Sequence, residues 1–244
     1  MNPLALQVKA SRALPAEHVK DVDGWRLRYS PGCSWWVSTV QPHGDTDPAG
    51  FERAVAAVEA FYAGFGAVAR FQLGPGALDD FLKLRGYPQK CLMSLQIAPA
   101  EVVAQRAPAG GFGLRVWDRP DRAWFETGIE VHGGGVDPRA EWALLQRVRE
   151  PSCYAGVLVG GRVVAVGRAV ADTGWAGVFG MATLPEARGR GAARAVLGAL
   201  ADWARRRGAG SMYLQVERDN DAALRLYGGA GFTQLCGYHY RVAG

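Results

Sequence analysis

Cysteine and histidine are scarce in this chain of 244 residues, and neither is grouped. The four cysteines stand far apart, at positions 33, 91, 153 and 236, and no two form a Cys-x-x-Cys pair. The familiar cysteine spacings of a zinc site are therefore missing, and the four scattered histidines suggest no other metal site. Separate cysteines are typical of reduced thiols, so we expect a cytoplasmic protein without a bound metal.

The chain also lacks targeting and membrane-spanning patterns. Residues 1–20 have neither the basic start nor the continuous apolar core of a signal peptide. No window reaches the apolar length that a bilayer requires. With 49% hydrophobic and 21% charged residues, the composition is that of an ordinary globular protein, and we expect no membrane partner.

Long runs of one charge are missing as well. The net charge is +5, but the densest basic run is only Arg205-Arg206-Arg207, at the expected end of a helix. Cations at that position complement the helix dipole. Since the sequence has no basic tail or stripe, we do not expect nucleic acid as a partner. A polyanionic cofactor would account for part of the positive charge.

The most informative segment that is present is Thr183–Arg194. It joins a strand-like apolar run, Trp175–Thr183, to a helix-like apolar run, Ala192–Arg206. A strand that ends in a glycine turn and opens into a helix leaves the first amides of the helix unpaired, which suits a phosphate group. Gly189 and Gly191 would let the backbone approach such an anion closely.

Three arginines accompany these glycines, at positions 188, 190 and 194, and guanidinium groups match phosphate oxygens. No Lys-Ser/Thr pair follows the glycines, so the segment is not a P-loop. Arg194 stands where the third glycine of a Gly-x-Gly-x-x-Gly loop would be. The pattern that remains is Arg188-x-x-Gly191-x-Ala193. A simple basic helix start is the alternative.

A second segment, 214–232, reads as strand, cap, helix, glycine stop and strand. Asp219 or Asn220 can cap the helix, and Gly231 can end it. The two segments together resemble the GNAT superfamily, the acetyl-CoA-dependent N-acetyltransferases. Their loop reads Gln/Arg-x-x-Gly-x-Gly/Ala and their second motif Asn-x-x-Ala-x-x-Leu-Tyr-x-x-x-Gly-Phe. This chain matches the second motif at Asn220, Ala223, Leu226, Tyr227, Gly231 and Phe232.

The resemblance implies an α/β (α+β) fold in which helices flank a mixed central sheet. A catalytic GNAT domain would span residues 112–244, after a linker-like stretch from Pro99 to Gly113. Before the loop we expect strands at Leu114–Trp117, Cys153–Val159 and Arg162–Ala171, with helices across Ala123–His132 and Pro138–Arg149. After it we expect a strand at Ser211–Val216 and another at Phe232–Val242.

Residues 1–100 follow the same order as the later part of the catalytic segment. Gln72 corresponds to Gln215, and Gly86-Tyr87 corresponds to Gly231-Phe232. We therefore predict a degenerate GNAT-like N-terminal half, and thus a pseudo-tandem protein, although any α/β chain alternates helices and strands. The expected elements are strands at Trp25–Tyr29, Ser34–Val40, Arg70–Leu73 and Leu92–Ile97, and helices at Phe51–Ala63 and Leu78–Leu84.

The loop of this first half, residues 41–48, carries two aspartates and no arginine. Because these charges would repel a pyrophosphate, we do not expect the first half to bind CoA. It would complete the architecture or wall the acceptor site. We expect it to pack on the catalytic half through Trp35-Trp36 or Phe61-Tyr62.

The resemblance makes acetyl-CoA the co-substrate and assigns residues to it. Tyr227 stands at the position of the general acid that protonates the departing thiolate, with apolar helix packing as the alternative. Capping alone would account for Asn220. The residues expected to contact CoA are Met181 and Thr183 through their backbone, the loop residues Arg188, Gly189, Arg190, Gly191, Ala192 and Ala193, and Asn220.

The general base is not apparent. The strand before the loop, where many relatives carry a glutamate, is uncharged. Gln215 stands where protein N-terminal acetyltransferases carry a glutamate, but glutamine cannot accept the proton. Glu217 would share the strand face of Gln215 and is the candidate. A surface charge, a water relay and an amine that arrives neutral remain alternatives.

These patterns predict an N-acetyltransferase. It would transfer the acetyl group of acetyl-CoA to a primary amine of a small molecule or peptide, by direct attack in a ternary complex. The protein would be a monomer or a homodimer. The alternatives are transfer of another acyl or aminoacyl group, and a non-catalytic sensor that binds acyl-CoA.

Overall fold

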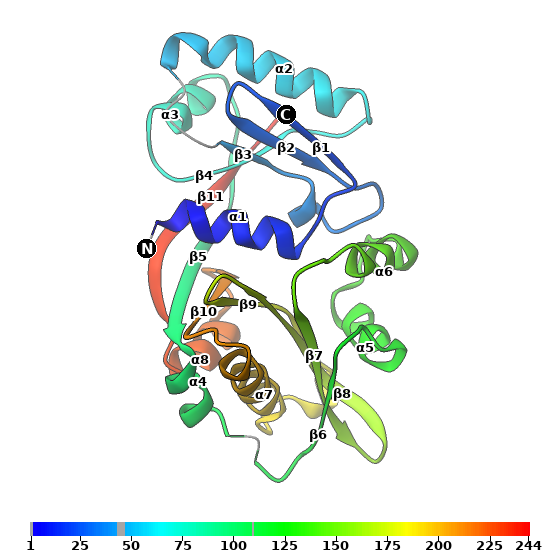
Figure 1. Cartoon of the computed structure of the whole chain (residues 1–244). Coiled ribbons are helices and arrows are strands. Elements are labelled where there is room, and N and C mark those ends of the chain that lie inside the picture. Colours follow the sequence, from blue (N-terminus) through cyan, green and yellow to red (C-terminus); the bar gives the residue numbers. More distant parts are fainter. Residues whose placement is uncertain (1, 43–46, 109) are drawn as a thin grey trace.

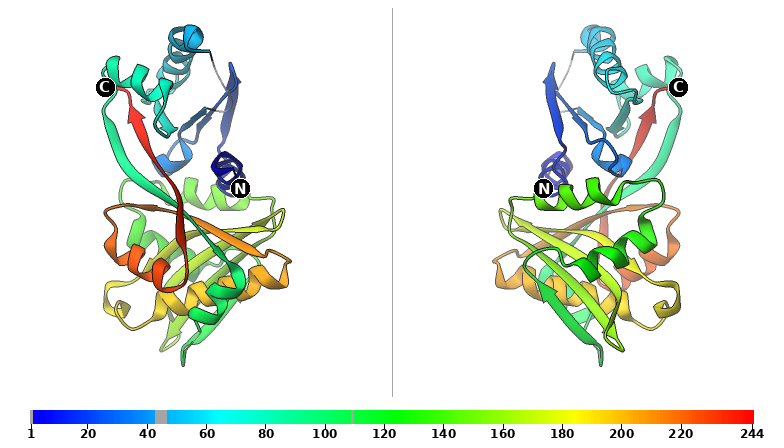
Figure 2. Two further views of the ribbon diagram at one scale, coloured as in Figure 1. Left: turned by 90° about the vertical axis from the view of Figure 1, so that its left-hand side faces the viewer. Right: turned by 90° about the vertical axis from the view of Figure 1, so that its right-hand side faces the viewer.

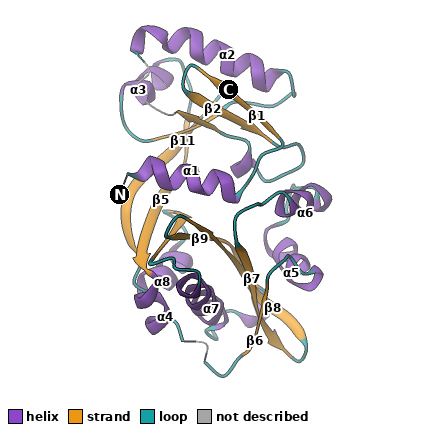
Figure 3. Ribbon diagram, in the orientation of Figure 1, coloured by secondary structure: helices purple, strands orange, loops and turns teal. Residues whose placement is uncertain are grey.

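The protein has a layered α/β fold, seen in a computed structural model that describes residues 2–42, 47–108 and 110–244 (Figure 1). Within these ranges eleven strands form one mixed sheet, in the order β1-β2-β3-β4-β11-β5-β10-β9-β8-β7-β6. Helices cover the sheet, as Figure 3 shows. The predicted mixed sheet flanked by helices is confirmed. Across the described ranges, no helix is long and apolar enough to span a membrane.

The C-terminal segment, from Gly113 to Val242, has the predicted order of elements. Side-chain caps help to set its helices: Asp121 accepts a hydrogen bond from the amide of Ala123 at 2.9 Å, and Asn220 accepts one from Ala223 at 3.1 Å. The elements are β6 (Gly113–Trp117), α5 (Arg122–His132), α6 (Pro138–Gln146), β7 (Ser152–Val159), β8 (Arg162–Asp172), β9 (Trp175–Thr183), α7 (Ala192–Arg206), β10 (Ser211–Glu217), α8 (Asp221–Gly229) and β11 (Thr233–Val242).

Helices α5 and α7 lie on opposite faces of the sheet. Successive side chains of a strand point to opposite faces. On β7, Cys153 and Ala155 accordingly belong to the apolar cluster of α7, whereas Tyr154 packs against Trp124 of α5, with ring centroids 4.9 Å apart. The two faces of the sheet therefore carry different helices.

The N-terminal segment departs from its prediction in four elements. The strand predicted at Ser34–Val40 is wrong, because Trp35–Val37 forms a 3₁₀ turn and β3 begins only at Val40. The β-prone Trp-Trp-Val run is overridden by packing: the stacked Trp35 and Trp36 rings lie edge-on against Tyr240, at 4.9 and 5.8 Å. The expected contact of Trp35-Trp36 with the C-terminal half is thus made, through Tyr240.

Two further elements of this segment, α1 and β1, were not predicted, and α4 lies inside the predicted linker. Residues 43–46 of the acidic loop lie outside the described residues. The elements are α1 (Pro3–Ala13), β1 (His18–Val22), β2 (Trp25–Tyr29), β3 (Val40–Pro42), α2 (Phe51–Ala63), β4 (Arg70–Leu73), α3 (Ala77–Leu84), β5 (Gln89–Pro99) and α4 (Ala100–Arg106).

The two halves exchange strands. Strand β5 of the first half lies between β10 and β11, and β11 of the second half pairs onward with β4. Figure 2 shows these two long strands crossing between the halves. The division of the chain into 1–100 and 112–244 remains a prediction about the sequence, and in space one sheet runs across it.

Helix α1 lies between the two halves, on the sheet face opposite α7 (Figures 1 and 2). Two fully buried arginines hold its C-terminal end. Arg168 of β8 donates to the carbonyl of Ala13 at 2.9 Å, and Arg28 of β2 donates to that of Leu14. Burial lowers the pKa of both groups, to about 10 for Arg28, so Arg28 remains a cation at neutral pH. Cations suit the negative end of a helix dipole.

The contact between α4 and α7 requires a glycine. A Cβ at Gly198 of α7 would stand 1.8 Å from the carbonyl oxygen of Ala107, just after α4. We predict that Gly198→Ala lowers the stability by about 1–3 kcal/mol, which is a fall of several degrees in Tm for a chain of this size.

Gly128→Ala in α5 is the matched control, because nothing lies within 4 Å of its added Cβ. Alanine is the better helix former, so this variant should melt at the same temperature or higher. Equal melting of both variants in a thermal scan would show that α4 and α7 do not approach as described.

Candidate active site

The site lies where β9 and β10 diverge. Their parallel pairing joins Ser211–Tyr213 to Trp175–Gly177 and then stops. Strand β10 continues against β5, and β9 continues against β8. Among the described residues, the edge of β9 from Val178 to Thr183 therefore has no strand partner on the β10 side. Its backbone groups are open to an extended ligand, which could bind as an added strand does.

A β-bulge interrupts β9 along this open edge. Val166 pairs with Ala182 and Arg168 with Phe179, so Gly180 and Met181 together stand opposite Gly167. Gly180 has a φ of +59°, a left-handed conformation that favours glycine. Bulges of this kind re-aim backbone groups next to binding sites.

The loop predicted to bind phosphate follows β9 directly. Arg188 folds back, and its Nε donates to the carbonyl of Thr183 at 3.1 Å. Gly189 and Gly191 have φ values of +72° and +88°, so both turns depend on glycine. Gly191 precedes α7 and offers no side-chain cap, which leaves the first amides of α7 open to an anion.

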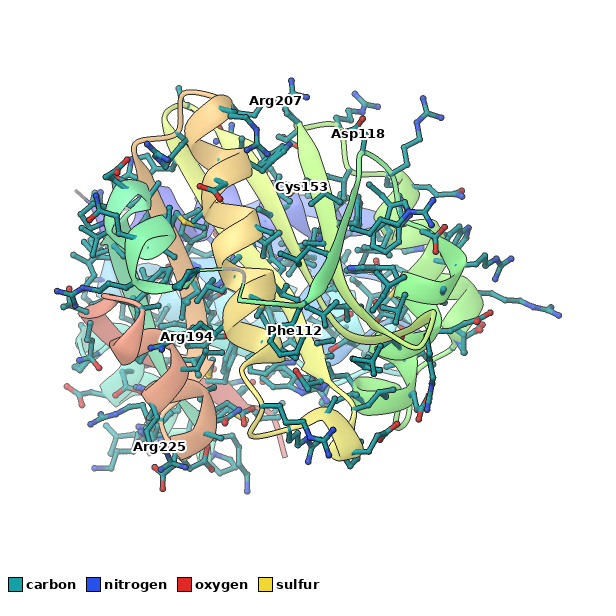
Figure 4. The ribbon with its side chains drawn as sticks, turned by 90° about the horizontal axis from the view of Figure 1, so that it is seen from below. Phe112, Asp118, Cys153, Arg194, Arg207 and Arg225 are labelled. Carbon is teal, nitrogen blue, oxygen red and sulfur yellow. The ribbon has the colours of Figure 1, made fainter. Side chains whose placement is uncertain are left out.

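The loop side chains divide by exposure. Arg188, Gly189, Arg190 and Gly191 are exposed, while Ala192 is buried and seats the start of α7 in the core. Figure 4 shows Arg194 at this end of α7, on the side of α8, with Phe112 nearby. The structure thus brings the predicted residues 188–193 together at one helix end.

A hollow larger than the one beside the loop lies in another part of the molecule. It has a volume of about 420 Å³ and is lined in part by Asp172, Thr173, Gly174 and Arg207. This hollow is at the opposite ends of β9 and α7 from the loop, and it lacks the unpaired helix amides. We therefore place the site at the loop and the open edge of β9 rather than in the larger hollow.

Helix α8 carries the next predicted residues. Asn220 caps the helix, as expected. Tyr227 is 8% exposed and shares the apolar cluster of α7. Within the described ranges, its hydroxyl has no hydrogen-bond partner. Burial raises the pKa of Tyr227 to about 12, so the phenol stays protonated at neutral pH.

Strand β10 carries Gln215 and Glu217. The Gln215 side-chain oxygen accepts hydrogen bonds from the Tyr238 hydroxyl at 2.5 Å and from the Gln72 amide at 3.4 Å. The two glutamines that correspond in the halves are therefore in contact. Glu217 is half-buried at the end of β10, on the other edge of the gap from Met181.

Sequence reasoning missed one residue at the site, His132. It ends α5, and its Nε2 lies 3.0 Å from the carbonyl oxygen of Met181, in the bulge of β9. The only sequence signal was its place at the end of a predicted helix, directly before the glycines 133–135.

Known proteins resemble the chain over these regions. The family model "Acetyltransferase (GNAT) family" matches residues 107–232. The chain is 26% identical to the uncharacterized N-acetyltransferase YobR of Bacillus subtilis, over 96% of this chain and 95% of that protein. A stretch of 62 residues is 47% identical to the N-alpha-acetyltransferase RimI of Mycobacterium tuberculosis, covering 25% of this chain and 37% of RimI.

Solved structures share the fold of both halves. A GCN5-related N-acetyltransferase from Kribbella flavida superposes with a TM-score of 0.72 at 16% identity, over 99% of this chain and 94% of its own. A tandem GNAT protein from the clavulanic acid biosynthesis pathway gives 0.68 at 15% identity, over 90% of this chain and 78% of its own. At these identities the likeness concerns the fold alone.

Reversing the charge of the loop should prevent CoA from binding. We predict that Arg188→Glu and Gly191→Glu each weaken CoA binding by tenfold or more, because each lost charge-assisted hydrogen bond contributes roughly 1.5–3 kcal/mol. Calorimetric titration with CoA measures the effect. Arg206→Glu, at the other end of α7, is the control and should bind as the wild type does. Unchanged affinity in both loop variants would place CoA elsewhere.

Proposed function

The chain belongs to the GNAT family of acetyltransferases, and we propose that it transfers the acetyl group of acetyl-CoA to a primary amine by direct attack in a ternary complex. One observation carries the proposal: the open edge of β9 leads directly into the glycine loop at the start of α7. That arrangement offers backbone pairing to a thioester arm and unpaired amides to a pyrophosphate.

The resemblance to the family assigns the cofactor contacts, and the open edge of β9 and the loop support them. The pantetheine arm would lie along β9 and pair with the backbone of Met181 and Thr183. The pyrophosphate would sit on the loop amides from Gly189 to Ala193. Arg188 uses its Nε for Thr183, and its exposed Nη groups would reach a phosphate together with Arg190. Asn220 caps α8 beside this space.

Tyr227 would act as the acid toward the leaving sulfur. With a pKa of about 12, the phenol keeps its proton throughout the neutral range. A thiol ordinarily titrates near pH 8.5, so complete transfer of that proton to the thiolate is uphill. The useful step is hydrogen-bond donation while charge develops on sulfur as the C–S bond breaks.

The acceptor amine would approach from the face that carries α5. Helix α7 occupies the other face, and α1 with the N-terminal half covers part of the acceptor face. The turn that follows β2 in the first half also contacts the start of α6. There the amide of Asp137 donates a hydrogen bond to the carbonyl of Gly32 at 2.7 Å. A small-molecule or peptide amine would thus enter between the two halves. Glu217 is the candidate base that the sequence suggested.

A second candidate function is acyl-CoA binding without transfer. It is favoured by β9 itself, which carries no titratable side chain along the open edge. A screen separates the two: thiol release from acetyl-CoA is measured with a panel of primary amines. Release with at least one amine supports the transferase. CoA binding without release for any amine would support the sensor.

Removal of the Tyr227 hydroxyl should slow the chemistry without weakening cofactor binding. We predict that Tyr227→Phe lowers kcat by about 10²-fold, the low end for an acid group, and leaves acetyl-CoA affinity unchanged. Tyr29→Phe in the N-terminal half is the control.

The raised pKa also predicts the pH profile. Because the donating, protonated form of Tyr227 persists up to about pH 12, its titration should not lower the wild-type rate between about pH 7 and 10. A normal kcat in Tyr227→Phe would mean that the side chain only packs.

A further inference from the structure

The imidazole of His132 lies at the open edge of β9. Its Nε2 is 3.0 Å from the carbonyl oxygen of Met181, and the side chain is exposed. A carbonyl oxygen can only accept a hydrogen bond, so the Nε2 that faces it carries the proton. In the neutral ring, Nδ1 then has a free lone pair. The ring is thus held in a tautomer that can accept a proton at its other nitrogen.

This carbonyl lies in the bulge of β9. Gly180 and Met181 stand together opposite Gly167, so the regular β8–β9 register is broken at Met181. A buried or half-buried backbone acceptor needs a partner, and His132 supplies it. The same unpaired stretch of β9 is where the thioester arm would lie.

The acceptor amine would reach the thioester from the sheet face on which His132 lies. Helix α7 and its loop lie on one face of the sheet, and α5, which ends at His132, lies on the other. CoA held by the loop leaves the α5 face of the gap to the amine. An amine that attacks the thioester from that face would arrive beside the imidazole.

We propose that His132 is the general base that takes the proton of the acceptor amine, with the Met181 carbonyl orienting its ring. This inference rests on the proposed acetyl transfer. Imidazole is the side chain that ordinarily gains and loses a proton closest to neutral pH, which suits a base that must be reset at every turnover. The orienting carbonyl has the role that a carboxylate has in a catalytic triad.

Every proton of the acetyl transfer has a donor and an acceptor. The neutral amine attacks the thioester carbon, the C–N bond forms, and the carbonyl oxygen becomes an oxyanion. Nδ1 of His132 takes one proton from the nitrogen, which is now positively charged. The oxyanion collapses, the C–S bond breaks, and the thiolate leaves as the acceptor of the Tyr227 hydrogen bond. Solvent carries the proton from the imidazolium to the thiolate, which gives the amide and free CoA.

The charged side chains near His132 form no ion pair with it in the described part of the chain. Strand β9 has no titratable side chain, and among the described residues no ion pair involves His132. Arg162 of β8 binds Glu130 of α5 at 3.2 Å and Glu186 of the loop at 2.8 Å, so both carboxylates are paired with this guanidinium and not with His132. Further charged groups on the adjoining segments are Arg122 and Glu126 of α5, Arg168 and Asp172 of β8, Asp137, Arg139 and Glu141 at the start of α6, and Arg188 and Arg190 of the loop.

The experiment compares pH–rate profiles of the full chain, measured as thiol release from acetyl-CoA with an active amine. His132→Gln keeps a donor for the Met181 carbonyl but cannot accept a proton. We expect kcat/KM to fall by about 10²-fold and the fall in rate at acid pH to shrink to the part caused by protonation of the amine itself, while calorimetric acetyl-CoA affinity stays unchanged. His18→Gln on β1 should retain the wild-type profile. Imidazole in the buffer should restore part of the rate of His132→Ala.

Each other outcome overturns a separate claim. If His132→Gln keeps the wild-type rate and acid limb, His132 is not the base, although acetyl transfer stands. If the acid limb is lost in Glu217→Gln and kept in His132→Gln, the base is Glu217. If the wild type binds acetyl-CoA but releases no thiol with any amine, the proposed acetyl transfer itself is wrong, and the base assignment fails with it.

Discussion

The early end of the β9–β10 pairing is the constraint on which the rest of the site depends. Two neighbouring strands that separate leave backbone groups without partners, and this is tolerated only where water, a side chain or a ligand satisfies them. Strand β10 can leave β9 because β5 pairs with it from Ser211 to Glu217. Since β5 comes from the N-terminal half, that half is part of the structure that keeps the gap open, although its own loop has no arginine.

The remaining contacts between the halves tie the exchanged strands together. Asp79 of α3 accepts hydrogen bonds from His239 at 2.8 Å and from Arg241 at 2.6 Å, both on β11, and all three side chains are largely buried. Polar contacts between the halves also include the hydrogen bond from Gln72 to Gln215. Of the two buried arginines that hold the end of α1, Arg168 adds another. Buried polar groups of this kind specify one arrangement because leaving any of them unpaired is costly.

Much of this structure was predictable from local sequence. The loop at Arg188–Ala193, the cap at Asn220 and most strands followed from turn glycines, capping residues and apolar runs, because those features act within a few residues. The strand exchange could not be predicted, because the pairing of β5 with β10 joins distant parts of the chain and has no local signature. Trp35–Val37 was mistaken for a strand since its composition does not reveal that both indoles pack on Tyr240. His132 was missed because its partner, the Met181 carbonyl, lies in a bulge that only the fold defines.

Hydrogen exchange of the full chain, with and without acetyl-CoA, tests the central claim most directly. The open edge of β9 and the loop at the start of α7 should bind the two parts of one cofactor. Acetyl-CoA should therefore slow the exchange of amides in both segments, 178–183 and 189–194, and leave strands β1 to β4 unchanged. Slower exchange confined to residues 171–174, at the end of β8 and in the following turn beside the larger hollow, would contradict the account. No change in either segment would also contradict it.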